Sequence, residues 1–424
     1  MNREIIPADQ LQAKVQLSGS KYLANRWVVL AALASQPVVL NNVVNNDDIN
    51  TAIKGLNALG YRLVQQDGAT IMSLPREQKL DRGVEVYTAH SGTFSRFVAA
   101  VAALDAVPIY LFGSDKMNSR PMEGIFSALR DLGVAIESED DTLPATITGP
   151  VKVLECSIDG SISSQYISAL LLVAPKLADD FVLTITGDAV STHYIDMTID
   201  LMRQLGVKVD VTGKQYRVKG AQDYRGGEFT IAPDPVSSSY FMGAAAICGG
   251  EVILNHFDFA SLQGEAKFYH CLQQMGCDIQ RNGQQMIIRR EQQSLIGQTF
   301  DMGEMPDVVQ TLASVACFAQ GTTVMKNIAH LAFKESNRIV DTATELAKLG
   351  AKVEYGRDYL AVTGGELVGT RLKTYDDHRM AMSLALIGAK VPGVVIEDAD
   401  VVSKSFPNYF DTLAAVGIQS KIVP

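Results

Sequence analysis

Basic side chains follow the polar openings of several helical stretches in this sequence. Lys21 and Arg26 come after the first opening, Arg96 comes after the second, and His378 and Arg379 come after the last. The start of a helix attracts anions, because its free N–H groups and the positive end of its dipole lie there. Arg suits a carboxylate through its two-pronged fork, whereas a phosphate suits mixed Arg and Lys. These residues predict a pocket for small anionic ligands.

The elements that position these cations are copies of one repeat. An apolar helical stretch that ends in a hydrophobic residue is followed by Gly and then by an alternating strand pattern. The six glycines in this position are Gly60, Gly133, Gly206, Gly276, Gly350 and Gly417. Their successive separations are 73, 73, 70, 74 and 67 residues. We expect each Gly to end a helix in the left-handed conformation that glycine tolerates best, and the near-constant spacing indicates a duplicated unit.

A second signature lies out of phase with the first. Small polar residues open an Ala-rich helical stretch at six places, again about seventy residues apart. The residues that mark these openings, all of types that cap helix N-termini, are Ser18, Ser91, Ser163, Ser237, Asp307 and Asp377. Each unit is therefore predicted to read strand, N-capped helix, strand, helix, Gly cap and strands. Three such units in each of two domains fit the length of 424 residues, with a boundary near 230–236, where two prolines stand in a polar run.

Composition excludes several classes of protein. A formal net charge of −10 at pH 7 argues against a nucleic-acid partner, which demands a basic face. The first residues lack the apolar core of a signal peptide, so a cytoplasmic protein is expected by default. The five cysteines form no CxxC pair and are expected to be reduced and mostly buried. The histidines show no ligand spacing, so no metal is expected.

Several motifs carry a resemblance to a known family. They include GSKYLANR (19–26), SGTFSR (91–96), SISSQY (161–166) and YDDHRMAM (375–382). With SRPM, STHYID, KES-NR and KSFPNYF they make the chain resemble the 5-enolpyruvylshikimate-3-phosphate synthases, a family of enolpyruvyl transferases, from about Leu17 to Phe410.

The resemblance implies a fold, a reaction and its substrates. The fold would be α/β, with two domains of three βαβαββ units each, an inside-out α/β barrel, and a ligand cleft between the domains. The N-terminal domain would span 20–232 and hold the acceptor phosphate, and the C-terminal domain would combine 1–19 with 233–424. The enzyme would transfer the enolpyruvyl group of phosphoenolpyruvate to the 5-hydroxyl of shikimate 3-phosphate. It would act as a monomer without a cofactor, a metal or a membrane partner.

The resemblance also assigns site residues. The residues matching those that hold phosphoenolpyruvate are Lys21, Gly92, Arg120, Gln165, Arg338, Arg379 and Lys404. The residues matching those around the acceptor are Tyr22, Arg26, Ser163, Ser164, Gln165, Ser191, Tyr194, Asp307, His330 and Lys334. Asp307 and Glu335 match the acid–base pair, and Lys21 could share either role. Proton transfer to and from the reacting atoms makes two carboxylates with separated pKa values a natural choice.

The sequence departs from the family pattern at several positions, two of which fall on the acceptor side. The departures include Tyr22, His90, Phe97, Gly303, His330, Ala332 and Asn337. Tyr22 stands where the family has a Ser that contacts the ring carboxylate, and His330 stands where it has an Asn that contacts the ring. A bulky phenol in place of a small hydroxyl changes the volume of a pocket. The sequence therefore leaves open a paralogue with a different ring-acid acceptor, as well as a binding protein without catalysis.

Two related families fit less well. UDP-N-acetylglucosamine enolpyruvyl transferases carry a reactive Cys in their first domain, and no Cys precedes Cys156 here. RNA 3′-phosphate cyclases share related repeats, but the acidic charge counts against a nucleic-acid substrate.

Overall fold

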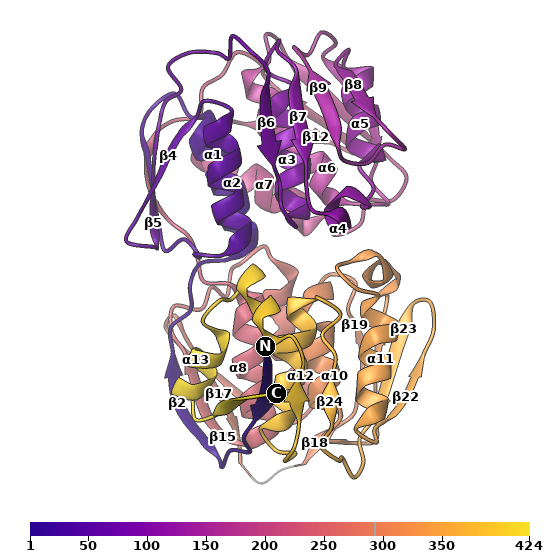
Figure 1. The fold of residues 1–424 in the computed structure, drawn as a ribbon. Coiled ribbons are helices and arrows are strands. Elements are labelled where there is room, and N and C mark those ends of the chain that lie inside the picture. The colour runs from indigo at the N-terminus through magenta and orange to yellow at the C-terminus, as the bar shows by residue number, and fades with distance from the viewer. Residues whose placement is uncertain (292–293) are drawn as a thin grey trace. The chain divides into compact units, whose positions relative to one another are not determined.

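A computed structural model describes residues 1–291 and 294–424 of the chain. The chain divides into two compact units. We call Lys21–Ile231 the N-terminal unit, and we call Met1–Ser20 together with Ala232–Pro424 the C-terminal unit. Each unit is an α/β assembly, so the predicted fold class is confirmed (Figure 1).

The chain passes between the units after Ser20 and after Ile231. The two passing segments are hydrogen-bonded to each other on the C-terminal unit. The N–H of Ser20 donates to the carbonyl of Ala232 at 2.7 Å, and the N–H of Asp234 donates to the carbonyl of Ser18 at 3.1 Å. These hydrogen bonds join the end of the segment Met1–Ser20 to the start of the segment Ala232–Pro424.

The N-terminal unit contains three four-stranded sheets, with strand orders β14-β3-β5-β4, β6-β7-β9-β8 and β10-β11-β13-β12. In each sheet the first pair is parallel and the other pairs are antiparallel. The strands are β3 (Val38–Asn41), β4 (Arg62–Gln66), β5 (Thr70–Leu74), β6 (Val84–Tyr87), β7 (Ile109–Phe112), β8 (Ala135–Ser138), β9 (Ala145–Thr148), β10 (Glu155–Asp159), β11 (Phe181–Thr186), β12 (Val209–Thr212), β13 (Gln215–Val218) and β14 (Gly227–Thr230). Because β14 ends the unit and pairs with β3 near its start, the third repeat closes onto the first.

The C-terminal unit repeats this pattern with help from the N-terminus of the chain. Its strands are β1 (Asn2–Ile5), β2 (Leu11–Val15), β15 (Gly250–Leu254), β16 (Asp278–Asn282), β17 (Gln285–Arg290), β18 (Leu295–Ile296), β19 (Thr299–Asp301), β20 (Ala319–Gln320), β21 (Thr322–Lys326), β22 (Lys352–Tyr355), β23 (Tyr359–Thr363), β24 (Arg371–Leu372), β25 (Val395–Ile396) and β26 (Ser420–Val423). Their four-stranded orders are β2-β15-β17-β16, β19-β21-β23-β22 and β24-β25-β1-β26. In Figure 1 the dark N-terminal strands β1 and β2 lie among the later elements of this unit. Residues 1–15 therefore complete two of its sheets.

Ala-rich helices fill the middle of each unit. The helices of the N-terminal unit are α1 (Lys21–Leu33), α2 (Asp47–Ala58), α3 (Gly92–Ala102), α4 (Asp115–Asn118), α5 (Glu123–Asp131), α6 (Ser164–Val173) and α7 (His193–Gln204). Those of the described C-terminal unit are α8 (Pro235–Cys248), α9 (Phe268–Gln274), α10 (Val309–Ala316), α11 (Arg338–Lys348), α12 (His378–Gly388) and α13 (Tyr409–Ala415). Every residue of α8, α10 and α12 is buried. These three helices pack on one another, as do α1, α3 and α6.

Hydroxyl groups join the inner helices of the C-terminal unit. Thr311 of α10 shares hydrogen bonds with Ser239 of α8 at 3.3 Å and with Ser383 of α12 at 3.2 Å. The three residues are successively 72 apart in sequence. Small side chains allow close helix packing, and paired hydroxyls avoid the cost of burying an unsatisfied polar group.

The predicted glycine caps are confirmed. Each of the six repeat glycines follows the last turn of a helix and has a positive φ, between 79° at Gly133 and 111° at Gly276. A side chain is strained in this region, whereas glycine enters it freely.

The predicted N-caps are only partly right. Ser91, Ser163 and Asp377 cap α3, α6 and α12 through their side chains. The predicted caps at the other three openings are wrong. Helix α8 is capped by Asp234, because Pro235 occupies the first helical position and moves the start upstream of Ser237. Ser18 lies before the start of α1 at Lys21. Asp307 lies within the short 3₁₀ helix η3 (Pro306–Val308) before α10, which has no side-chain cap.

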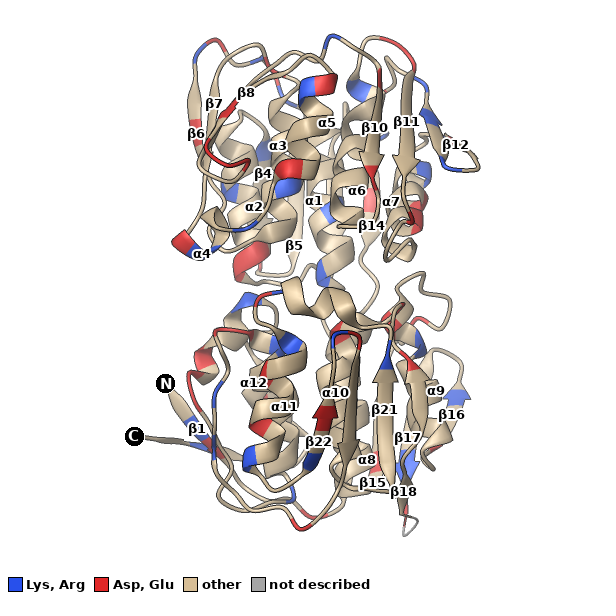
Figure 2. Ribbon diagram, turned by 90° about the vertical axis from the view of Figure 1, so that its right-hand side faces the viewer, with Lys and Arg blue, Asp and Glu red and all other residues tan. Residues whose placement is uncertain are grey.

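All five cysteines are buried free thiols, in agreement with the sequence prediction. Within residues 1–291 and 294–424, no helix is long and apolar enough to cross a membrane. The same residues contain no group of His, Cys, Asp and Glu that could hold a metal ion. Figure 2 shows basic and acidic residues interspersed along both units.

Candidate active site

Arg338, the first residue of α11, is the centre of the charged site in the C-terminal unit. Its Nη1 lies 2.6 Å from Asp307 Oδ1, its Nη2 lies 2.9 Å from Glu335 Oε2, and its Nε lies 2.8 Å from Asp377 Oδ2. The Arg338 side chain is 1% exposed, so water screens these pairs little. Burial alone would lower the pKa of Arg338, but the adjacent carboxylates of Asp377, Glu335 and Asp307 raise it above its usual value.

Asp377 links the starts of two helices. As the N-cap of α12 it accepts a hydrogen bond from the backbone N–H of Arg379 at 2.9 Å. Its other oxygen accepts from Ser336 Oγ at 3.0 Å and from Arg338 Nε. One carboxylate therefore caps α12 and fixes the guanidinium that begins α11.

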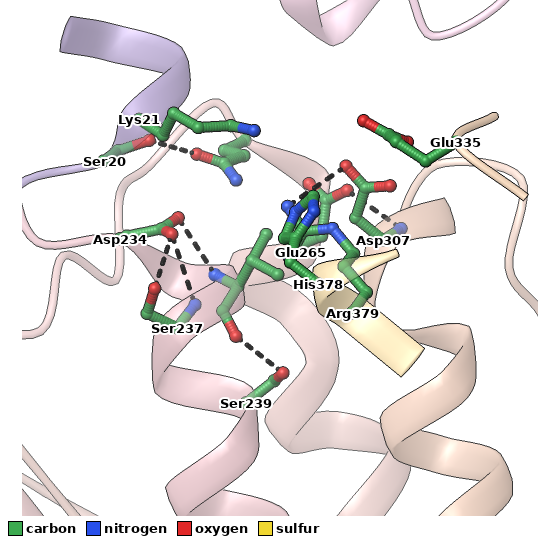
Figure 3. A network of polar contacts seen from close by, with 12 residues as sticks. Ser20, Lys21, Asp234, Ser237, Ser239, Glu265, Asp307, Glu335, His378 and Arg379 are labelled. Atoms are coloured by element: carbon green, nitrogen blue, oxygen red, sulfur yellow. Dashed lines mark hydrogen bonds and ion pairs between the residues drawn. The ribbon is translucent and has the colours of Figure 1, made fainter. Parts of the chain in front are cut away.

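Asp307 forms a second ion pair, with the guanidinium of Arg379. Its Oδ2 lies 3.5 Å from Arg379 Nη2, and its backbone N–H donates to Glu265 Oε1 at 3.4 Å (Figure 3). Burial raises the pKa of Asp307, yet the fields of Arg379, Lys334 and Arg338 together hold that pKa well below its usual range. Asp307 is consequently a carboxylate at neutral pH.

Glu335 bridges two cations. Its Oε2 pairs with Arg338, and its Oε1 lies 2.9 Å from Lys404 Nζ. Lys404 ends the 3₁₀ helix η5 (Ala399–Lys404). The structure thus brings together Asp307, Glu335, Arg338 and Lys404, four of the residues to which the resemblance assigns catalytic or phosphoenolpyruvate-binding roles.

Arg379 and His330 complete this side. Arg379 Nη1 donates to the hydroxyl of Tyr240 at 3.1 Å, which fixes the guanidinium beside Asp307. His330 lies in the 3₁₀ helix η4 (Ala329–Phe333). Burial, and then the positive charge of Lys334, lower the pKa of His330 to about 4. His330 is therefore neutral at pH 7.

The N-terminal unit holds its predicted acceptor residues differently. Arg26 is 1% exposed, and its donors reach Thr198 Oγ1 at 2.7 Å, Ser168 Oγ at 3.3 Å and the Tyr194 carbonyl at 3.2 Å. It also donates to the carbonyl of Tyr22 at 2.9 Å. Burial lowers the pKa of Arg26 to about 10, although Tyr194 opposes the shift. The guanidinium lies beneath the surface, and its predicted contact with an acceptor stays a prediction.

Two tyrosines stack above this arginine. The rings of Tyr22 and Tyr194 have centroids 5.0 Å apart and planes 29° apart, and Arg26 lies 5.6 Å from the Tyr194 ring. Arg26 holds the backbone carbonyls of both tyrosines. It therefore fixes the position of an aromatic pair, one member of which replaces a small hydroxyl residue of the family pattern.

Lys21 begins α1 and pairs with an acid that sequence reasoning missed. Its Nζ lies 3.2 Å from Asp48 Oδ2, with side chains 10% and 6% exposed. Asp48 stands in the first turn of α2, where the helix dipole favours a negative charge. The ammonium assigned to phosphoenolpyruvate by the resemblance is thus oriented from within the N-terminal unit.

Small and hydroxyl side chains mark the remaining part of this unit. Ser163 caps α6 and accepts from the backbone N–H of Gln165, whose Nε2 donates to Thr93 Oγ1 at 3.2 Å. Ser164 is buried in the first turn of α6, and Ser191 stands near the start of α7 with φ of 52°. Hydroxyls at two helix starts are consistent with the phosphate cradle that the resemblance assigns to them.

Gly92 has a physical reason to be glycine. A Cβ built at this position would lie 2.5 Å from Arg120 Nη1 and 2.5 Å from Arg96 Nη1. Arg96 donates to the carbonyl of Gly92 at 2.8 Å. Any side chain at position 92 would therefore displace two guanidinium groups.

Three departures from the family pattern have a structural role here. Asn337 caps α11 by accepting from the backbone N–H of Val340, as an Asp would. Phe97 is a buried core residue on which Arg26 packs, 5.5 Å from the ring centroid. His90 Nδ1 lies 2.7 Å from Ser114 Oγ, close to the start of α4.

Comparison with known proteins agrees with these features. The family model of EPSP synthase (3-phosphoshikimate 1-carboxyvinyltransferase) matches residues 5–413. The chain is 37% identical to the 3-phosphoshikimate 1-carboxyvinyltransferase of Photobacterium profundum over 96% of its own length and 97% of that protein. It is 35% identical to the protein of that name from Citrobacter koseri, over 97% of each.

Solved structures share the fold over the whole chain. A structure of EPSP synthase from Acinetobacter baumannii has a TM-score of 0.84 at 22% identity and covers 100% of both chains. A second structure from the same organism has a TM-score of 0.81. From its match to the family model and to these relatives, the chain belongs to the EPSP synthase family, the 3-phosphoshikimate 1-carboxyvinyltransferases.

Proposed function

We propose that the enzyme transfers the enolpyruvyl group of phosphoenolpyruvate to the 5-hydroxyl of shikimate 3-phosphate and releases phosphate. The hydroxyl oxygen adds to C2 of phosphoenolpyruvate and gives up its proton, while C3 gains a proton. The tetrahedral intermediate then loses a proton from C3, and its bond to the phosphate oxygen breaks. The two relatives described above are named for this activity, and the chain matches each of them over nearly its whole length.

The observation that most supports this proposal is the contact of one guanidinium with two carboxylates. Arg338, which is assigned to phosphoenolpyruvate, lies within 2.6 Å of Asp307 and 2.9 Å of Glu335. These contacts support the proposal, because a carboxylate of phosphoenolpyruvate bound to Arg338 would lie beside the proposed acid and base. Both reacting partners are anions, so their arrival raises the pKa of Asp307 from its depressed value and makes it a better base.

The two units contribute different groups to this proposal. Arg338, Arg379 and Lys404 of the C-terminal unit, with Lys21, Gly92, Arg120 and Gln165 of the N-terminal unit, hold phosphoenolpyruvate. Ser163, Ser164, Gln165 and Ser191 hold the phosphate of the acceptor, and Tyr22, Arg26 and Tyr194 shape the place of its ring. Asp307, His330 and Lys334 approach the acceptor from the C-terminal unit. The enzyme acts as a cytoplasmic monomer without a cofactor, and light scattering tests its mass in solution.

One observation favours a second acceptor. The ring of Tyr22 stacks on Tyr194 at 5.0 Å, where a small hydroxyl is the family pattern. Such a pair reduces the space for a ring acid and removes a short donor.

A panel assay decides between the two acceptors. Phosphate release from phosphoenolpyruvate is measured with shikimate 3-phosphate and with other phosphorylated ring acids at matched concentrations. The proposal expects the highest kcat/KM for shikimate 3-phosphate. A higher value for another ring acid would establish the paralogue, and no release with any of them would favour a binding protein.

A further inference from the structure

A buried carboxylate outside the assigned site, Glu345 of α11, holds a strained turn that leads into it. Glu345 is 0% exposed. Its Oε1 accepts from the hydroxyl of Tyr375 at 2.6 Å, and its Oε2 accepts from the backbone N–H of Lys373 at 3.0 Å. Lys348 Nζ lies 2.7 Å from both oxygens. A fully buried carboxylate with this many donors is a fixed anchor.

The turn that Glu345 holds is unfavourable by itself. The backbone N–H of Asp377 donates to the carbonyl of Thr374 at 2.9 Å, which closes a four-residue turn. Its central residues, Tyr375 and Asp376, have φ of 54° and 56°. Turns with two central residues at positive φ favour Gly, Asn and Asp, and a Tyr there is strained. Strained backbone of this kind persists where surrounding contacts enforce it.

The same turn leads into helix α12, which carries Arg379 of the proposed phosphoenolpyruvate site. Its last residue, Asp377, caps α12 and binds Arg338 at 2.8 Å, and Arg379 follows within the first turn of α12. Helix α11 therefore grips the turn at two points two helical turns apart. Arg338 binds the residue that ends it, and Glu345 binds a residue in its middle.

We infer that Glu345 and Tyr375 are positioning residues for phosphoenolpyruvate, which clamp the turn Thr374–Asp377 to α11 and so fix Asp377, Arg338 and Arg379. The inference rests on the proposed function for the identity of the ligand. Because this clamp lies within the C-terminal unit, its loss changes the phosphoenolpyruvate side and leaves the hydroxyl groups at the starts of α6 and α7 in place.

Tyr375→Phe tests the clamp, because it removes one hydroxyl and keeps the ring. Tyr409→Phe is the matched control: its hydroxyl donates to the carbonyl of Met382 in α12 at 2.6 Å, away from the turn. We expect Tyr375→Phe to raise KM for phosphoenolpyruvate about fivefold or more, as loss of a hydrogen bond to a charged group does, with KM for shikimate 3-phosphate within about twofold. Tyr409→Phe should change neither KM. An unchanged KM for phosphoenolpyruvate in Tyr375→Phe, or an equal rise in both KM values, would overturn the inference.

Hydrogen exchange of residues 374–380 provides a readout that needs no substrate. Exchange should be faster in Tyr375→Phe and in Glu345→Gln than in Tyr409→Phe, because the turn is released from α11. Equal exchange in Tyr375→Phe and Tyr409→Phe would overturn the clamp even in an active enzyme. If wild-type protein releases no phosphate with shikimate 3-phosphate, the proposed function fails, whereas the exchange result still decides the clamp.

Discussion

Each unit contains a fully buried arginine, and the two arginines, Arg26 and Arg338, are held by opposite kinds of partner. In the C-terminal unit, Arg338 is matched by the carboxylates of Asp307, Glu335 and Asp377. In the fully described N-terminal unit, Arg26 is held by hydroxyl and carbonyl oxygens. The consequence is visible in their pKa values: burial lowers that of Arg26 to about 10, whereas the carboxylates raise that of Arg338 despite equal burial.

The difference indicates how each of the two arginines is used. A cation among carboxylates is already neutralised. Under the proposed function, a ligand carboxylate would bind there by exchange with Asp307 or Glu335, and the displaced carboxylate would become available for proton transfer. A cation among neutral oxygens keeps its full charge, but Arg26 is buried against the ring of Tyr194. It fixes the backbone of both tyrosines, and under the proposed function the hydroxyls at helix starts contact the ligand.

The largest effect is expected from removing one arginine in each unit. Arg338→Met removes one buried cation from the carboxylates of Asp307, Glu335 and Asp377, and should lower the free energy of unfolding by about 3–5 kcal/mol. Arg26→Met leaves neutral acceptors unsatisfied and should cost about 1–3 kcal/mol.

The single Trp makes these two effects separable. Trp27 lies in α1 of the N-terminal unit, so its fluorescence during urea unfolding reports that unit, while far-ultraviolet circular dichroism reports both. Arg26→Met should move the fluorescence midpoint, and Arg338→Met should move the dichroism with little change in fluorescence. Equal losses from the two variants would remove the contrast between the units.

The next effect concerns Asp307 as the proposed general base. Asp307→Ala should lower kcat by on the order of 10²-fold or more, as loss of a general base does. Asp301→Asn is a suitable control, because Asp301 is an exposed carboxylate that holds Gly303 and Asn327 nearby. Phosphate release under saturating substrates measures both variants. A small change in Asp307→Ala would assign the base to another residue.

A smaller effect is expected on the aromatic side. If the Tyr22 ring occupies space that the acceptor needs, Tyr22→Ser should lower KM for shikimate 3-phosphate about threefold or more and leave KM for phosphoenolpyruvate unchanged. Tyr22→Phe keeps the stack on Tyr194 and serves as the control. Steady-state kinetics with each substrate varied in turn provide the measurement. No gain with Ser would mean that the ring lies outside the acceptor's place.

Local rules made the repeats predictable from the sequence. The glycine caps could be read because a positive φ after a helix is a property of a few adjacent residues, and Gly60 or Gly350 needs no distant partner to explain it. The helix starts were predicted less well. At Ser237 the correct cap, Asp234, is selected by Pro235, a neighbour that a search for Ser alone overlooks.

The pairing of charges could not be read in the same way. Glu265 and Asp48 lie in segments that the motifs do not include, and only the packed fold of each unit brings Glu265 to Asp307 and Asp48 to Lys21. Arg26 illustrates the same limit, because a basic residue near a helix start can face a ligand or the core. Its hydrogen bonds to α6 and α7 turn the Arg26 side chain toward the core. The spacing of residues along α1 does not reveal this orientation.

The last effect concerns the pH dependence of stability and His330, a neutral group among the charges of the C-terminal unit. Its folded pKa of about 4 lies below the ordinary 6.5, so the unfolded chain binds more protons between these values. Stability should therefore be highest above pH 6.5 and fall as the pH drops toward 4, by about 2 kcal/mol from this residue. His330→Asn should flatten this part of the profile, as measured by urea unfolding from pH 7 to 4. Burial is the larger cause and Lys334 the next, so Lys334→Met should recover part of the loss, and an unchanged slope in both variants would mean that His330 is open to water.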